Sequence, residues 1–259
     1  MLFLTGDMHG EAGCLESRLR AAESLAGREL REGDEILVLG DVGLRYGASE
    51  GFGLMASMER AWRRRGVRFA VMRGNHDTRY CRDLRNGSYG GGGFREEPWR
   101  GGTALVGSQT DAVLYLPDEG GVFEACGRPF AVLPGAYSVD GDLRLRMRWP
   151  YERAEQLTAA EMAALIDAVD GVGIEFVLSH TCPASWLPLI SDLFLGGLDQ
   201  SKVDKGMERF MDAVLERVSG TCRGWWFGHY HDNREVGDEL GIGHMLLDGV
   251  AVLPGTEDE

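Results

Sequence analysis

Short apolar runs recur along the chain, and each stops at a glycine or at a group of polar residues. The runs that predict strands are residues 2–5, 36–39, 67–72, 174–178 and 225–227. Their length and predominantly apolar character are typical of strands buried on both faces. Residues 11–25 and 53–65 instead carry apolar side chains at three- and four-residue spacing, as amphipathic helices do. Because strands and helices alternate, the amino-terminal part predicts a parallel sheet built through right-handed crossovers.

The middle and the end of the chain show other patterns. Three apolar runs separated by turn sequences predict an antiparallel meander, at residues 112–116, 121–126 and 130–133. Two further helices are expected at residues 158–169, which begin with a capping box, and 202–218. The glycine-rich segment Asn86–Gly102 predicts a mobile loop near the site. Arg95 and Trp99 are candidate substrate contacts on it, and a surface loop that only connects elements is the slightly favoured alternative.

Histidines and carboxylates gather directly after five of the predicted strands. They are Asp7 and His9, Asp41, Asn75 and His76, His180, and His229 and His231. These positions hold five of the six histidines of the chain. In open α/β sheets, ligands bind at the carboxyl ends of the strands, and imidazole and carboxylate groups suit Zn, Fe and Mn. A carboxylate shared by two cations allows them to lie about 3.5–4 Å apart, so we expect a metal site.

Composition narrows the functional classes. The chain has 259 residues and no polar or Pro-rich linker, which favours a single domain over residues 1–259. A formal charge of −14 disfavours binding to long nucleic acids. The five cysteines form no C-x-x-C pair, so neither a disulfide framework nor a zinc ribbon is indicated. No apolar run is long enough to span a membrane or to form a signal peptide, and a cytoplasmic location is expected.

The order and spacing of the polar residues resemble the calcineurin-like metallophosphoesterase superfamily. The family motifs D-x-H, G-D, G-N-H-[DE], a lone H and G-H-x-H match Gly6–His9, Gly40–Asp41, Gly74–Asp77, His180 and Gly228–His231. The resemblance implies an α/β fold, a four-layer αββα sandwich with two mixed β-sheets. It implies one divalent cation held by Asp7, His9, Asp41 and His231, and another held by Asp41, Asn75, His180 and His229. Mn is the favoured ion, and Fe, Zn, Ni and Mg are compatible alternatives.

The resemblance also implies an activity, the hydrolysis of phosphate esters by in-line attack of a metal-bridging hydroxide. His76 matches the family's histidine that protonates or stabilises the leaving oxygen. Asp77 either orients His76 or serves as a turn or helix-cap carboxylate. A phosphomonoesterase is favoured, while a phosphodiesterase acting on nucleotides or small diesters and a non-catalytic metal-binding scaffold stay open. The substrate is expected to be a phosphorylated small molecule, a nucleotide or a phosphoprotein.

Two arginines are candidate contacts for the substrate phosphate, with a solvated surface position as the alternative for each. Arg45 matches an arginine of the phosphoprotein-phosphatase branch, but Leu44 stands where that branch has the aspartate that orients its histidine. Arg144 alternates with Arg146 and Arg148, a pattern that predicts one face of an exposed strand.

Overall fold

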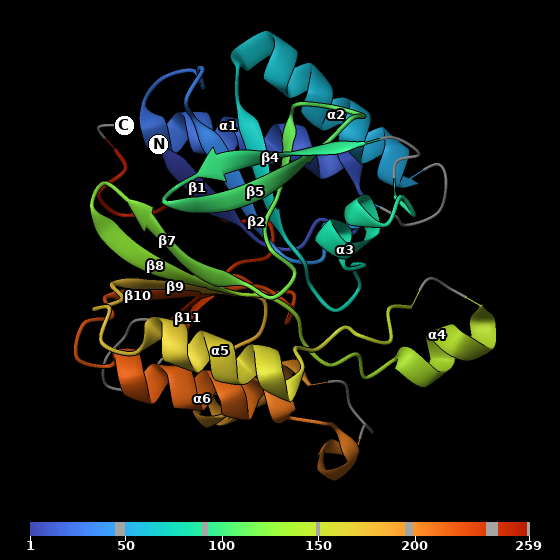
Figure 1. Ribbon diagram of the computed structural model, residues 1–259, viewed down its shortest axis with the longest axis vertical. Coiled ribbons are helices and arrows are strands. Elements are labelled where there is room, and N and C mark those ends of the chain that lie inside the picture. Colours follow the sequence, from blue (N-terminus) through green and yellow to red (C-terminus); the bar gives the residue numbers. More distant parts are fainter. Residues whose placement is uncertain (45–49, 90–92, 149–150, 195–198, 237–242, 258–259) are drawn as a thin grey trace.

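The computed structural model describes residues 1–44, 50–89, 93–148, 151–194, 199–236 and 243–257. Its strands form two β-sheets that face each other, with helices on both outer sides (Figure 1). Buried side chains from both sheets, among them Leu37, Val132 and Phe176, form one hydrophobic cluster between them. The layers therefore follow the order helix, sheet, sheet, helix, which confirms the expected four-layer sandwich.

The first sheet has seven strands in the order β13, β1, β2, β3, β6, β5 and β4. Their bounds are β1 Leu2–Thr5, β2 Glu35–Leu39, β3 Arg68–Met72, β4 Phe94–Trp99, β5 Gly102–Gly107, β6 Val113–Tyr115 and β13 Val250–Val252. Strands β1, β2, β3 and β6 pair in parallel, and the outer strands pair antiparallel. The parallel core of this sheet confirms the crossovers expected from the alternating strand and helix patterns.

The second sheet has six strands in the order β11, β12, β10, β9, β8 and β7. Their bounds are β7 Gly121–Ala125, β8 Arg128–Leu133, β9 Phe176–Ser179, β10 Gly224–Phe227, β11 Arg234–Val236 and β12 Gly243–Met245. Strands β8, β9, β10 and β12 are parallel, and the two edge strands are antiparallel to their neighbours. Both sheets are thus mixed, as expected.

Helices cover the outer face of each sheet. The α-helices are α1 Leu15–Ala26, α2 Glu50–Arg65, α3 Tyr80–Arg85, α4 Gly141–Met147, α5 Ala159–Val169 and α6 Gly206–Val218. Short 3-10 segments are η1 Ala12–Cys14, η2 Ala184–Leu193 and η3 Gln200–Lys202. Apolar side chains of α1 and α2 pack on the first sheet, and those of α5, α6 and η2 pack on the second. Within the described ranges, no helix is long and apolar enough to cross a membrane.

The predicted meander is divided between the two sheets. Strand β6 pairs in parallel with β3 in the first sheet, whereas β7 and β8 form an antiparallel pair in the second. The local sequence defines each strand and turn, but the choice of partner depends on side chains from distant segments that share a core. The three-stranded meander is therefore wrong as a unit, although each of its strands exists.

The predicted mobile loop over residues 86–102 is also wrong for its second half, since residues 94–99 form β4 and pair with β5. Trp99 is buried and its Nε1 donates a hydrogen bond of 3.0 Å to Glu35 Oε1. Arg95 lies in an ion pair of 2.5 Å with Asp111. Pro98 is tolerated because β4 is an edge strand, which needs donors on one side only. Trp99 is thus held by Glu35 of β2 and Arg95 by Asp111, while a contact of either residue with a substrate stays a prediction.

The arginines at 144, 146 and 148 lie on a helix instead of a strand. Helix α4 spans Gly141–Met147, and Arg148 ends it in the left-handed conformation with φ of 56°. Leu, Arg and Met are strong helix formers, and here their propensity outweighs the alternation of charge. Figure 1 shows α4 standing away from the layers on two extended connections. The helix therefore belongs to the segment of residues 134–157 between β8 and α5, which is called the excursion below.

Candidate metal centre

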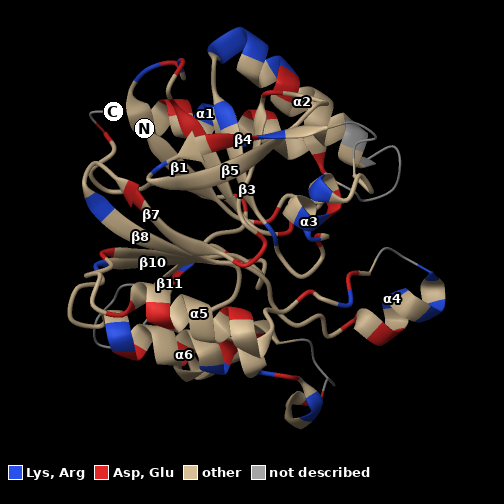
Figure 2. Cartoon of the chain, in the orientation of Figure 1, with Lys and Arg blue, Asp and Glu red and all other residues tan. Residues whose placement is uncertain are grey.

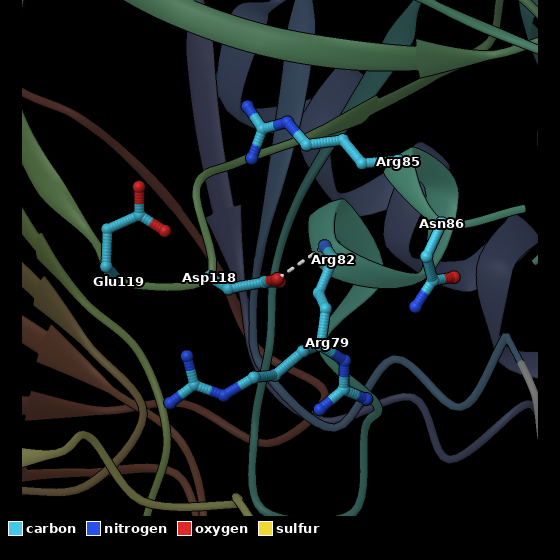
Figure 3. Close-up of a pocket in the computed structure, with 6 residues that line it drawn as sticks. All are labelled: Arg79, Arg82, Arg85, Asn86, Asp118 and Glu119. Carbon is cyan, nitrogen blue, oxygen red and sulfur yellow. Dashed lines mark hydrogen bonds between the residues drawn. The ribbon is translucent and has the colours of Figure 1, made fainter. Parts of the chain in front are cut away.

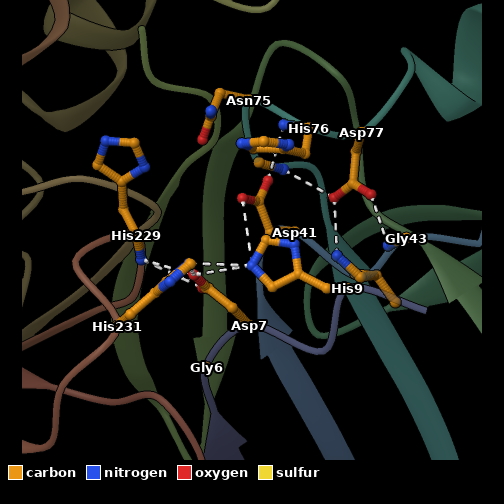
Figure 4. A network of polar contacts seen from close by, with 12 residues as sticks. Gly6, Asp7, His9, Asp41, Gly43, Asn75, His76, Asp77, His229 and His231 are labelled. Atoms are coloured by element: carbon orange, nitrogen blue, oxygen red, sulfur yellow. Dashed lines mark hydrogen bonds and ion pairs between the residues drawn. The ribbon is translucent and has the colours of Figure 1, made fainter. Parts of the chain in front are cut away.

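The carboxyl ends of β1, β2, β3, β9 and β10 meet where the two sheets face each other, and the loops that follow these strands carry the predicted ligands (Figure 4). Three groups of side chains offer ligand atoms that lie within 4.8 Å of one another. They are Asp7, His9 and His231; His9, Asp41 and His76; and Asp41, His180 and His229. Because Asp41 belongs to two of the groups, the arrangement fits two neighbouring cations that share one carboxylate.

On one side of Asp41, two imidazoles converge. The Nε2 atoms of His9 and His231 are 3.0 Å apart, and Asp7 Oδ2 lies 3.2 Å from Nε2 of His231. Two neutral imidazole nitrogens with their lone pairs facing each other at this distance repel, unless a proton or a cation lies between them. The accompanying carboxylate makes this donor set suitable for a divalent cation.

On the other side, His180 is completely buried and its ring is fixed by two contacts. Its Nδ1 lies 2.8 Å from the carbonyl oxygen of Leu39, so Nδ1 donates and the lone pair belongs to Nε2. That Nε2 lies 2.8 Å from Asn75 Oδ1 and 3.4 Å from Asp41 Oδ1. A backbone carbonyl thus holds the imidazole in the tautomer that a metal ligand needs.

The electrostatics of the centre agree with this reading. Burial raises the pKa of Asp41, but the nearby His180, His76 and His9 together outweigh burial and hold that pKa well below its ordinary value. Burial lowers the pKa of His180, yet the Asp41 and Asp7 carboxylates, with the Leu39 carbonyl, raise it to about 9. Burial holds the pKa of His229 well below its ordinary value, so this imidazole is neutral. The centre supplies an ionised carboxylate and, once a cation displaces the His180 proton, neutral imidazoles.

The glycines of the motifs are required because side chains pack against their α-carbons. A Cβ on Gly74 would lie 2.1 Å from Asp41 Oδ1, and one on Gly228 would lie 2.3 Å from Asp7 Oδ1. A Cβ on Gly40 would lie 2.3 Å from Nδ1 of His180. Any larger residue would therefore displace a candidate ligand.

Four candidate ligands have a left-handed backbone, which costs about 1–3 kcal/mol per non-glycine residue. Their φ angles are 46° for His9, 46° for Asp41, 72° for His229 and 55° for His231. Hydrogen bonds hold this conformation, because His9 N donates to the Asp41 carbonyl at 2.8 Å and His229 N donates to Asp7 Oδ1 at 3.1 Å. Such strain concentrates at functional sites, and no residue pattern in the sequence indicates it.

Asp77 is buried and its two oxygens accept four hydrogen bonds. The donors are the backbone N–H groups of Val42, Gly43 and Gly74, at 3.0, 2.8 and 2.9 Å, and the Tyr80 hydroxyl at 2.7 Å. None of these four bonds involves the neighbouring imidazole. Asp77 therefore joins the loops after β2 and β3, as the turn-carboxylate alternative describes, and it positions the segment that carries Asp41.

His76 meets an arginine from α4. Arg144 Nη1 lies 2.6 Å from His76 Nδ1, and Arg144 is buried. A guanidinium only donates, so Nδ1 must accept and the ring proton belongs to Nε2. Burial lowers the pKa of His76 and the Arg144 charge lowers it further, which keeps the ring neutral. Arg144 was expected to contact phosphate, whereas the structure places it on the candidate catalytic histidine.

A second connection from the same excursion, which was missed in the sequence, reaches Asn75. Its Nδ2 donates to Ser138 Oγ at 2.9 Å, and Ser138 N donates to Glu155 Oε1 at 2.9 Å. All three side chains are buried. Because the amide nitrogen has this partner, the amide oxygen of Asn75 is turned toward His180 and the other ligand atoms. Ser138 and Glu155 lie on opposite sides of α4 in the sequence and carry no motif.

The other predicted phosphate contact is Arg45, which lies outside the described residues, so its role stays a prediction. A separate hollow of about 430 Å³ is lined by three further arginines of α3 and its start (Figure 3). Each is paired with an acid: Arg79 with Glu161 at 2.6 Å, Arg82 with Glu152 at 2.5 Å and Arg85 with Glu96 at 3.6 Å. This hollow is held together by its own ion pairs.

Comparisons with known proteins identify the family of this chain. A solved phosphopantetheinyl hydrolase from Mycobacterium tuberculosis is 15% identical with a TM-score of 0.45, over 95% of this chain and 89% of that one. A sulfate thiohydrolase, SoxB, from Thermus thermophilus is 15% identical with a TM-score of 0.40, over 92% of this chain and 38% of that one. The search among curated proteins found no significant match. The family model for calcineurin-like phosphoesterase matches residues 2–233, a span that contains every candidate ligand described above, and the chain therefore belongs to that family.

Proposed function

We propose that this protein is a hydrolase of phosphate monoesters that depends on two divalent cations, with Mn as the favoured ion. The observation that carries the proposal is the convergence of three ligand groups, in which His9 connects the first group to the second and Asp41 connects the second to the third. Asp7, His9, Asp41 and His231 would hold one cation, and Asp41, Asn75, His180 and His229 the other. Cations bound there lower the pKa of a bound water toward neutrality and offset charge on the phosphoryl oxygens.

The chain's own groups would act on the leaving side of the substrate. His76 Nε2 carries the ring proton, because Nδ1 accepts from Arg144, and this N–H can donate a hydrogen bond that stabilises negative charge on the leaving oxygen. The backbone N–H of His76 donates to Asp41 Oδ1 at 2.8 Å, which fixes the loop on which the imidazole stands. Asp41 in this way connects the proposed metal centre to the proposed proton donor.

A monoester is favoured over a diester by charge. A phosphate monoester is a dianion at neutral pH, whereas a diester carries one negative charge. The buried guanidinium of Arg144 adds a positive charge beside His76, in addition to the charge of the cations. A site with this surplus of positive charge stabilises the dianion more strongly.

The experiment compares p-nitrophenyl phosphate with bis(p-nitrophenyl) phosphate, using protein loaded with Mn, Fe, Zn, Ni or Mg and protein treated with chelator. We expect kcat/KM to be higher for the monoester and to vanish after chelation. The Asp41→Asn variant serves as the metal-free control. Faster hydrolysis of the diester would assign the protein as a phosphodiesterase. Stoichiometric metal without turnover of either ester would assign it as a binding scaffold.

A further inference from the structure

A cleft of about 590 Å³ opens beside the proposed metal centre. Candidate site residues line one part of it, namely Asp41, Asn75, His76, His229 and His231. Most of the other lining residues are apolar or aromatic, and six of them are called the apolar wall here: Tyr137, Val139, Leu187, Leu193, Phe194 and Val203. A phosphate bound at the site residues would therefore have an apolar surface beside its ester group.

Half of the apolar wall comes from η2 and the residue that ends it, namely Leu187, Leu193 and Phe194. Leu187 is buried in the hydrophobic core that α5, α6 and η2 form with the second sheet. Leu193 and Phe194 pack against that core, while part of each stays exposed. The rings of Phe194 and Tyr230 lie 6.4 Å apart, and Tyr230 also lines the cleft. Packing on this core and on Tyr230 thus holds this part of the apolar wall in place.

Charge in the cleft is sparse. Among the described residues that line it, Lys205 is the only Lys or Arg, and its Nζ lies 5.9 Å from the ring centre of Phe194. Asp140 and Glu208 line the same cleft with carboxylates. Figure 2 shows the Lys and Arg residues spread over several helices of both halves. Substrates with several phosphates need several cations, so this cleft is suited to a substrate with a single phosphate.

The apolar surface continues out of the cleft onto α4. Of the eight large apolar side chains that are exposed among the described residues, four lie in residues 139–147: Val139, Leu143, Leu145 and Met147. Val139 is 43% exposed and also lines the cleft, so it joins the two surfaces. Leu143 and Met147 are four residues apart and share one face of the helix.

We propose that the cleft is a subsite for the leaving group of an amphipathic phosphoester, whose single phosphate lies at the metal centre. Its apolar chain or ring system packs against the η2 wall and extends past Val139 toward α4. The position of the phosphate rests on the proposed function. A volume of about 590 Å³ lies within the range of small-molecule pockets, which is about 300–1,000 Å³, and this argues for a free small molecule instead of a phosphoprotein.

The test is a binding series that needs no turnover. Calorimetry would measure the Kd of ethyl-, butyl-, hexyl- and octylphosphonate for Mn-loaded protein, since a C–P bond is not hydrolysed. Each methylene buried in the cleft should tighten binding about fourfold until the cleft is filled. A Kd that is independent of chain length would overturn the proposal, and so would tighter binding of a nucleoside phosphonate or a phosphonate peptide than of octylphosphonate.

Two variants locate the effect. Leu193→Ser, in the wall, and Val139→Ser, at the exposed rim, should each reduce the gain in affinity per methylene. Leu189→Ser is the matched control, because Leu189 lies on the same 3-10 segment, is 50% exposed and is not among the lining residues. This location would be refuted if the gain in affinity per methylene were unchanged in both Leu193→Ser and Val139→Ser, or if Leu189→Ser lost as much of it.

The outcome is separable from that of the proposed function. If the chain-length dependence is present but no ester is hydrolysed, the subsite stands and the hydrolase proposal fails. If esters are hydrolysed without chain-length dependence, the hydrolase stands and the subsite fails.

Discussion

Removal of Arg144 tests whether α4 takes part in the chemistry. The guanidinium lies 2.6 Å from His76 Nδ1 and holds the ring proton on Nε2. In Arg144→Gln the ring loses a charged donor, and a hydrogen bond to a charged group contributes about 1.5–3 kcal/mol. If His76 donates to the leaving oxygen, this loss corresponds to about a 10- to 150-fold decrease in kcat.

The assay should compare two monoesters that differ in their leaving groups. An alkyl phosphate needs a proton on its leaving oxygen, whereas p-nitrophenolate leaves readily without one, so Arg144→Gln should impair the alkyl ester more strongly. Arg146→Gln is the control, since Arg146 lies on the same helix and is exposed. Metal content, measured by elemental analysis, should be unchanged in both variants.

A double-mutant cycle with His76→Ala completes the test. His76→Ala alone should retain metal and lower kcat by about 10²–10⁴-fold, the usual range for a general acid. Because Arg144 is expected to act through His76, adding Arg144→Gln to His76→Ala should cost little more. Additive losses, or equal losses for both leaving groups, would refute the coupling and return Arg144 to a direct role on phosphate.

Three further predictions follow from the centre and the fold. Protein purified without chelator should contain two transition-metal ions per chain by elemental analysis, and the Asp41→Asn variant should lose both ions. Metal-saturated wild-type protein with only one ion per chain would contradict the dinuclear centre. Ser138→Ala should weaken the metal site nearest Asn75 by about 10- to 100-fold in a metal titration, while an unchanged affinity would mean that the Asn75 amide is held by other contacts. Burial raises the pKa of Asp34, but Arg28 at 2.6 Å, the Arg31 N–H and the amino terminus together outweigh burial and hold the pKa at about 2, below the ordinary 3.8. A lowered folded-state pKa stabilises the protein above pH 3.8 and loses this effect as pH falls toward 2. Asp34→Asn should therefore cost about 1–2 kcal/mol at pH 7, after allowing for solvent screening of Arg28, and little at pH 2, measured by urea denaturation.

The convergence of the candidate ligands could be predicted because the position of each one is coded locally. An apolar strand followed by glycine and a polar residue specifies where a side chain lies at the edge of a sheet, and parallel strands bring such edges together. His9, Asp41 and His180 are far apart in the sequence, yet the pattern of each strand and the crossover rule bring them to one edge. The four-layer sandwich was implied by the family resemblance, and the alternating strands and helices agree with it.

The contacts that orient the candidate site residues could not be predicted from local sequence patterns. Arg144 and His76 are joined by a contact across 68 positions, and no periodicity relates them. The alternating arginines even suggested a strand, because exposed helices and exposed strands differ little in polarity when the segment is short. The left-handed backbone at His9 likewise depends on hydrogen bonds from a neighbouring loop and has no glycine to mark it.

The residues at the strand ends and the segment between β8 and α5 have different expected consequences for function. The residues at the strand ends match motifs of the family, which explains why seven candidate ligands could be named from the sequence. The excursion that carries Ser138, Arg144 and Glu155 reaches this centre at Asn75 and His76, and it also supplies Val139 to the cleft. One segment thus contacts a proposed ligand, the proposed proton donor and the proposed subsite. Selectivity for the ester group is therefore expected to depend on residues 134–157 more than on the motifs.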